Sequence, residues 1–333
     1  MRFLVTGTAG FVGFHVARRL LADGHDVTGI DGMTAYYDVS LKEARNAILA
    51  REPGYRFHRL MLEDAEALHA AALSADPEIV IHLGAQAGVR YSLEQPRAYI
   101  DSNIVGTFNL MEFCRHHPVR HLLAASTSSA YGGNTKMPFT ETDRAVHPLT
   151  IYAASKVATE LIAHSYAHLW HVPTTIFRLF TVYGPWGRPD MALFKFVAAM
   201  LAGEPIDIYN NGQMERDFTY IDDAVAAILR LVDEIPAAGV PICAVDTVSP
   251  VAPYRLVNVG GGTLVPLMEF IAAIEAAIGI AAKRNYLPMQ AGDVPRTRAS
   301  AELLEMLTNT RPATPIETGV RAFIAWYRDY FKI

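Results

Sequence analysis

Cysteine is scarce in this sequence, and long uncharged apolar runs are missing. Cys114 and Cys243 are the only cysteines and show no metal-binding spacing, so we expect free thiols in a reducing compartment and no metal site. No stretch reaches the roughly 18 uncharged apolar residues of a membrane span. The apolar N-terminus runs directly into glycines, unlike a signal peptide. These absences predict a cytoplasmic protein without a membrane partner.

A surplus of positive charge is missing as well. The 29 Lys and Arg residues are outnumbered by 34 Asp and Glu residues, and the net charge of −5 disfavours nucleic acid as the main partner. Hydrophobic residues make up 51% of the 333 positions, which predicts a folded globular protein rather than a disordered one. A chain of this length can form two cores, or one α/β core with a smaller lobe.

Three glycines follow the first predicted strand, residues 2–5. Gly7, Gly10 and Gly13 form a Gly-x-x-Gly-x-x-Gly loop before an apolar-periodic helix that we expect to end near residue 23. In such a loop the first glycine permits a tight turn, the second lets backbone N–H groups approach a pyrophosphate, and the third lets the helix pack closely on the strand. An ordinary strand–turn–helix is the alternative, but the position on the first strand favours a dinucleotide site.

The second predicted strand, residues 26–30, ends at Asp31, eighteen residues after Gly13. A carboxylate at this position can accept hydrogen bonds from a ribose diol and would repel a 2′-phosphate. A solvated turn aspartate is the alternative interpretation. The spacing predicts NAD, rather than NADP, as the cofactor.

Strands and helices continue to alternate along the chain. Strands are predicted at residues 55–60, 79–83, 121–125, 174–179 and near 206, and helices from about 64, from 96 to about 117, at 191–202 and from 316. This alternation predicts a Rossmann-like, doubly wound parallel sheet with a smaller C-terminal α/β substrate lobe. We place an NAD-binding domain at residues 1–180 and the lobe at 181–333, with segments that return to the first domain.

Hydroxyl side chains follow the strand at 121–125. Open α/β sheets bind ligands beyond the carboxyl ends of their strands, so Thr127 is placed to hydrogen-bond a reacting alcohol. Tyr152 and Lys156 share one helix face, where an ammonium can stabilise a phenolate. Alone, these features are more often a capping turn and a solvated helix face. Their combination with the glycine loop indicates a catalytic group.

With these motifs in order, the sequence resembles the extended short-chain dehydrogenase/reductase family. More narrowly, it is similar to the UDP-glucuronate 4-epimerases over nearly the whole chain. The segments that carry this resemblance are Tyr-Tyr-Asp at 36–38, the stretches 85–92, 181–191 and 216–223, and Gly-Asp-Val at 292–294. The most specific of them is 181–191.

The resemblance implies an enzyme that epimerises C4 of UDP-glucuronate through a 4-keto sugar, with NAD as cofactor and a homodimeric assembly. Tyr152 would be the base and acid, Lys156 would favour its anion, and Thr127 would hold the same substrate oxygen. The implied cofactor contacts are Gly7, Gly10, Phe11, Val12, Gly13, Asp31, Leu62, Leu83, Ala85, Gln86, Tyr152 and Lys156. The implied substrate contacts are Arg90, Ser92, Thr127, Thr181, Arg188, Arg216 and Asp293. Among these, Arg188 would grip the sugar carboxylate and Arg216 the pyrophosphate.

Two positions depart from the family pattern. Relatives usually have an acid at the end of the third strand, where this chain has Met61, and often an asparagine where it has Gly32. Either backbone and apolar contacts alone would hold the adenine, or Glu63 or Asp64 would substitute for the missing acid. Other readings also remain open: a galactose-type 4-epimerase, a glucuronate decarboxylase, a sugar 4,6-dehydratase, or a dinucleotide sensor without catalysis.

Overall fold

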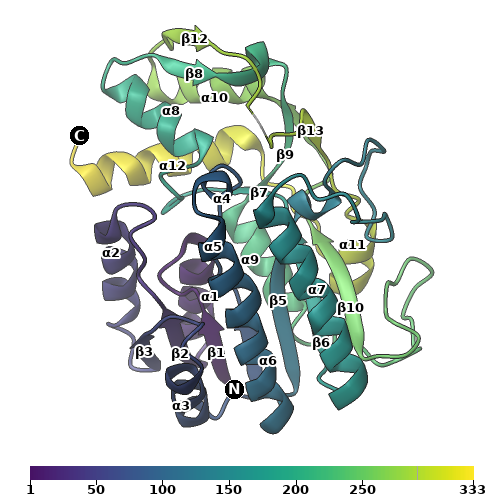
Figure 1. Ribbon diagram of the computed structural model, residues 1–333. Coiled ribbons are helices and arrows are strands. Elements are labelled where there is room, and N and C mark those ends of the chain that lie inside the picture. Colours follow the sequence, from purple (N-terminus) through teal and green to yellow (C-terminus); the bar gives the residue numbers. More distant parts are fainter. Residues whose placement is uncertain (291) are drawn as a thin grey trace.

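The computed structural model describes residues 1–290 and 292–333 (Figure 1). Its centre is a seven-stranded sheet in the order β10-β6-β5-β4-β1-β2-β3, in which every neighbouring pair is parallel. The strands are β1 (Arg2–Thr6), β2 (Asp26–Asp31), β3 (Tyr55–Arg59), β4 (Ile79–His82), β5 (His121–Thr127), β6 (Thr174–Leu179) and β10 (Tyr254–Val259). The predicted parallel sheet is confirmed.

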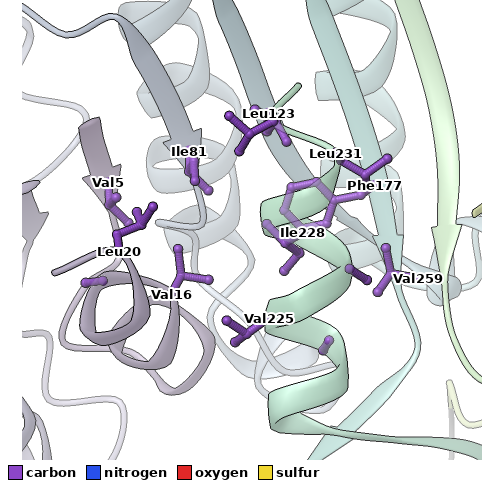
Figure 2. Packing of buried hydrophobic residues seen from close by; sticks show 14 of the residues in the cluster. Val5, Val16, Leu20, Ile81, Leu123, Phe177, Val225, Ile228, Leu231 and Val259 are labelled. Atoms are coloured by element: carbon purple, nitrogen blue, oxygen red, sulfur yellow. The ribbon is translucent and has the colours of Figure 1, made fainter. Parts of the chain in front are cut away.

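Helices cover both faces of this sheet, because its central strands are apolar on both sides. On one face, α1 (Phe11–Ala22) and α9 (Ile221–Arg230) pack against the strands. Figure 2 shows Val16 of α1 facing the helix α9, which carries Val225 and Ile228, while Leu20 lies beside Val5 of β1. The opposite face is covered by α3 (Ala65–Ala75), α6 (Gly106–His116) and α7 (Ile151–Trp170). The sheet is therefore doubly wound, as predicted.

The helix predicted from residue 96 to 117 consists of three parts. A π-helical segment, η1 (Ile100–Val105), joins α5 (Pro96–Tyr99) to α6, and a short α4 (Tyr91–Glu94) precedes them. The π-helical turn carries the buried Asn103, whose amide oxygen accepts the Gln86 N–H at 2.8 Å. The same amide donates to Ser155 Oγ on α7 at 2.9 Å. The irregular turn thus ties the loop after β4 to α7, and π-turns often occur at functional sites.

The second half of the chain builds a smaller lobe over the carboxyl ends of the parallel strands (Figure 1). Its two small sheets contain β7 (Thr181–Tyr183), β9 (Glu215–Tyr220), β11 (Leu264–Pro266) and β13 (Arg296–Thr297), and β8 (Ile206–Ile208) paired with β12 (Arg284–Tyr286). Its helices are α8 (Ala192–Leu201), α10 (Leu267–Ile278) and α12 (Ile316–Phe331). Phe270, Ile274 and Phe323 lie in their shared core. The predicted C-terminal α/β lobe is present.

Parts of the second half return to the large sheet. The edge strand β10, the helix α9 and the helix α11 (Glu302–Thr308) all contribute to the hydrophobic core that also contains α1. The division at residue 180 stays a prediction. None of the helices described combines the length and the apolar character needed to cross a bilayer. Over residues 1–290 and 292–333, no group of three or more His, Cys, Asp or Glu side chains is arranged to hold a metal ion.

Candidate active site

One cavity lies at the carboxyl ends of the central strands. It is lined by residues that follow or end β1, β2, β4, β5 and β6, as the switch-point rule for open α/β sheets requires. All twelve predicted cofactor residues line this cavity, and Thr127 and Arg188 line it with them. The fold therefore brings residues between positions 7 and 188 together at one site.

The glycine loop fits a bound pyrophosphate. Gly7 has φ +79°, and a Cβ there would lie 2.8 Å from the backbone nitrogen of Gly84. A Cβ on Gly13 would collide with the Gly7 carbonyl oxygen, so this helix–strand contact requires glycine. Gly10 is the N-cap of α1, and no side chain caps the first N–H groups of the helix. These donors, at the positive end of the helix dipole, are free for a phosphate.

Asp31 lies at the end of β2 and lines the cavity. Its carboxylate accepts the N–H of Ala9 at 3.0 Å and of Met33 at 2.8 Å, so its position is fixed by backbone on both sides. The ribose contact expected of this residue stays a prediction. Lys42 on α2 (Val39–Leu49) lines the same cavity, buried, with its amine donating to the Thr34 carbonyl at 2.8 Å.

The two departures from the family pattern are coupled. A Cβ on Gly32 would collide with the Met61 sulfur, so the side chain of Met61 fills the space that an asparagine at residue 32 would use. Asp64 is the N-cap of α3 and accepts the Ala67 N–H at 3.1 Å, which leaves it engaged within its own helix. Glu63 has one buried carboxylate oxygen without a partner in the described part of the chain. Of the two proposed substitutes, Glu63 is the freer one.

Tyr152 and Lys156 both line the cavity from α7. Burial raises the pKa of Tyr152, while the Thr127 hydroxyl and the Arg188 guanidinium act in the opposite direction. Burial lowers the pKa of Lys156 to about 8, against the attraction of Glu160 one helical turn further on. The protein alone therefore favours the neutral phenol, and ionisation of Tyr152 requires added positive charge at the site.

Thr127 ends β5 and directs its hydroxyl by a local hydrogen bond. Its Oγ1 accepts the N–H of Ser129 at 3.1 Å, at the start of η2 (Ser128–Tyr131). Because the oxygen already accepts, its proton remains available for donation to a substrate oxygen. The next two residues are Ser128 and Ser129, and neither is an acid.

Arg188 lies in the turn between β7 and α8, in the cavity that contains Tyr152. Its guanidinium forms a bidentate pair with Asp190, with Nε donating to Oδ1 at 2.9 Å and Nη2 donating to Oδ2. The Tyr36 hydroxyl donates to the same carboxylate at 2.9 Å. Tyr36 and Asp190 lie in segments that carry the family resemblance, but no role was predicted for either, and they are 154 positions apart in the chain.

The remaining predicted substrate residues lie outside the main cavity. Thr181, with Arg188, lines a smaller adjoining pocket. Arg90 and Asp293 form an ion pair with each other at 3.2 Å, and the buried Ser92 donates to the Val89 carbonyl. Arg216 on β9 donates to the carbonyls of Glu215 and Pro295. The substrate contacts of these five residues stay predictions.

The fold and the cavity define a dinucleotide-dependent enzyme with a tyrosine–lysine pair beside the cofactor loop. The model of the NAD dependent epimerase/dehydratase family matches residues 3–242. A probable UDP-glucuronate 4-epimerase of Rhizobium meliloti (strain 1021) is 58% identical over 100% of this chain and 98% of its own length. The chain therefore belongs to the NAD dependent epimerase/dehydratase family, and NAD is its cofactor.

Solved structures agree with this assignment. A UDP-glucuronic acid 4-epimerase from Bacillus cereus, in complex with UDP-glucuronic acid and NAD, has a TM-score of 0.89 and 30% identity, with 99% of this chain and 100% of that chain covered. A UDP-glucose 4-epimerase with UDP-glucose from Thermotoga maritima has a TM-score of 0.87 and 27% identity, covering 99% and 100%. The similarity thus extends to enzymes for a charged sugar and for a neutral one.

Proposed function

We propose that this protein interconverts UDP-glucuronate and UDP-galacturonate by oxidation and reduction at C4. The observation that carries the proposal is the guanidinium of Arg188 in the same cavity as Tyr152 and Thr127. Arg188 is partly buried, and its planar fork of N–H donors suits the carboxylate by which a glucuronate differs from a glucose. The relatives with glucuronate activity support the same substrate.

The residues of the chain have separate tasks in this reaction. Bound NAD supplies a positive ring together with the acceptor and donor of the hydride at C4. Tyr152 removes the proton from the 4-hydroxyl and later returns it, and Lys156 favours the phenolate. Thr127 donates a hydrogen bond to the same oxygen. Since the hydride that leaves C4 also returns to it, the reaction needs no external oxidant.

Arg188 has a second task, which is to retain carbon. Oxidation at C4 converts the glucuronate into a β-keto acid, which loses carbon dioxide when the bond to the carboxylate aligns with the carbonyl π-orbital. A guanidinium that holds the carboxylate out of this alignment protects the intermediate. Ser128 and Ser129, which directly follow Thr127, provide no carboxylic acid that could assist the loss of carbon dioxide. Epimerisation without carbon loss is therefore the proposed outcome.

Arg216 on β9 is proposed to bind the pyrophosphate, and Asp293 to lie near the uridine ribose. Arg90, Ser92 and Thr181 are proposed to line the path of the sugar nucleotide. The electrostatics support this in part, because the Asp293 carboxylate faces both Arg90 and Arg216. We propose that the enzyme acts in the cytoplasm as a homodimer.

Incubation of the purified protein with separate UDP-sugars tests the proposed function. UDP-glucuronate should give UDP-galacturonate, resolved by chromatography, and UDP-glucose should react at least about tenfold more slowly because it has no carboxylate to accept the hydrogen bonds of Arg188. Preference for UDP-glucose would favour the galactose-type epimerase instead. Formation of a UDP-pentose as the main product would favour the decarboxylase.

A further inference from the structure

Arg188 lines the cavity, and one edge of its guanidinium is already occupied. Asp190 takes the edge formed by Nε and Nη2. Among the described residues, Nη1 has no hydrogen-bond partner, and Nη2 keeps one further N–H. A planar guanidinium presents its five donors in a fixed fork, so occupation of one edge determines where the other edge lies. A substrate carboxylate would meet the Nη1–Nη2 edge.

Asp190 is itself held by a residue from the first part of the chain. The Tyr36 hydroxyl donates to its Oδ2 at 2.9 Å. Burial and the neighbouring Asp190 charge raise the pKa of Tyr36, so this phenol stays a donor over the whole neutral range. Burial opposes ionisation of Asp190, but the Arg188 charge and the hydrogen bonds outweigh it, and the pKa of Asp190 lies below its usual value. The Arg188–Asp190 pair is thus ionised, neutral overall and fixed in orientation.

The turn that carries both residues is anchored to the cofactor loop. Arg45 on α2 is fully buried; its Nη2 donates to the Trp186 carbonyl at 2.6 Å, and its Nη1 donates to the Ala9 carbonyl at 2.9 Å. One side chain therefore connects the glycine loop with the residues just before Arg188. The free edge of Arg188 is consequently placed relative to the cofactor as well as to Tyr152.

We propose that Asp190, held by Tyr36, is a positioning residue that sets which edge of Arg188 receives the substrate carboxylate and thereby prevents decarboxylation. The proposal rests on the proposed function, because decarboxylation can occur only if the sugar that is oxidised at C4 is a glucuronate. Its physical basis is that Asp190 neutralises Arg188 while orienting it. The substrate is then held by directed hydrogen bonds with little net charge attraction.

This arrangement predicts opposite effects on binding and on product. In Asp190→Asn the amide group can accept from Nε but cannot accept from Nη2, so the guanidinium loses its fixed plane. The same change removes a negative charge beside Arg188, which strengthens its attraction for the substrate carboxylate. We expect the Kd for UDP-glucuronate to stay equal or fall, epimerisation to slow about tenfold, and the fraction of decarboxylated product to rise at least about fivefold.

Two other variants define the pattern. Arg188→Ala removes the clamp itself and should weaken UDP-glucuronate binding, which Asp190→Asn should not. Tyr36→Phe removes one hydrogen bond to Asp190 and should shift the product ratio in the same direction by a smaller factor. Asp329→Asn, at an exposed pair with Lys332, is the matched control and should match the wild type.

The experiment uses the full-length, NAD-loaded protein. Chromatography coupled to mass spectrometry measures UDP-galacturonate and the 4-keto-pentose over time, and calorimetry measures the Kd for UDP-glucuronate and for UDP. An unchanged product ratio in Asp190→Asn, with normal UDP affinity, would overturn the role of Asp190. If that variant does not fold, an unchanged ratio in Tyr36→Phe would overturn it. A wild type inactive on UDP-glucuronate would instead refute the proposed function.

Discussion

At the scale of single residues, the chemistry centres on Tyr152. Replacing it with phenylalanine removes one hydroxyl and leaves the ring, which meets Tyr99 edge to face at 5.9 Å between ring centroids. Loss of general acid–base help typically lowers turnover 10²–10⁴-fold. We expect the kcat of Tyr152→Phe to fall by at least about 10²-fold, while its Kd for UDP-glucuronate changes less than about threefold. Single-turnover kinetics and calorimetry measure the two quantities. Near-full activity would show that another group is the base.

Asp31 is predicted to determine the choice between NAD and NADP. A 2′-phosphate would bring negative charge against a carboxylate that two backbone N–H groups hold in place. We expect NADP to bind at least about tenfold more weakly than NAD, and Asp31→Ala to narrow this difference. Fluorescence titration of the apoprotein with both dinucleotides gives the ratio. Equal affinities in the wild type would exclude this role, and Lys42 would then be the residue to examine.

At the scale of helices and strands, the parts predicted from sequence are those with a local signal. The strands before Gly7 and Asp31 have apolar runs bounded by glycine or acid, and the glycine spacing gives the cofactor loop directly. The π-helical turn at Ile100–Val105 has no periodicity of its own, so the sequence showed one uninterrupted helix. The return of β10 to the large sheet depends on long-range pairing with β6.

The residues of the candidate site also divide into those that a local sequence pattern predicts and those that it does not. Thr127, Tyr152 and Lys156 follow from position relative to a strand end and from helical spacing, which neighbouring residues encode. The contact between Tyr36 and Asp190 joins segments 154 residues apart, and no local pattern encodes it. Arg90 and Asp293 lie still further apart, at 203 positions, and were assigned separately although they pair with each other.

The buried histidines of the sheet and α1 predict a loss of stability in mild acid. Burial lowers the pKa of His82 to about 3, of His15 to about 3 and of His121 to about 4. Their pKa is about 6.5 in the unfolded chain, so below that pH the unfolded state binds more protons and stability falls with falling pH. With about 1.4 kcal/mol per pKa unit for each group, we expect a loss on the order of 5 kcal/mol between pH 7 and 5.

Urea denaturation at several pH values between 7 and 5 measures this slope. In His121→Asn, the slope of the unfolding free energy against pH should decrease by the equivalent of up to one proton. In His168→Gln, at an exposed site, this slope should be unchanged. A free energy of unfolding that stays constant over this range would contradict the buried, neutral state of these histidines.

At the scale of the whole molecule, the outer faces of α6 and α7 predict the dimer. Both helices expose large apolar side chains, with Phe108 46% and Leu161 66% exposed. Their place together on one side of the sheet gives a surface that two copies can share across a two-fold axis. We expect a dimeric mass in light scattering, and a monomeric mass for the double variant Phe108→Arg with Leu161→Arg.

Met306 on α11 is equally exposed, at 61%, and lies on a different helix. Met306→Arg is therefore the control and should remain dimeric. A wild type that is monomeric at all concentrations would rule this assembly out.

The reaction proposed for this enzyme is oxidation of UDP-glucuronate at C4, followed by return of the same hydride to the opposite face. The most direct measurement uses UDP-glucuronate carrying deuterium at C4, followed by mass spectrometry and NMR of the product. We expect UDP-galacturonate that keeps its deuterium at C4 and all six sugar carbons. Loss of the label to solvent, or a five-carbon sugar as the main product, would contradict it.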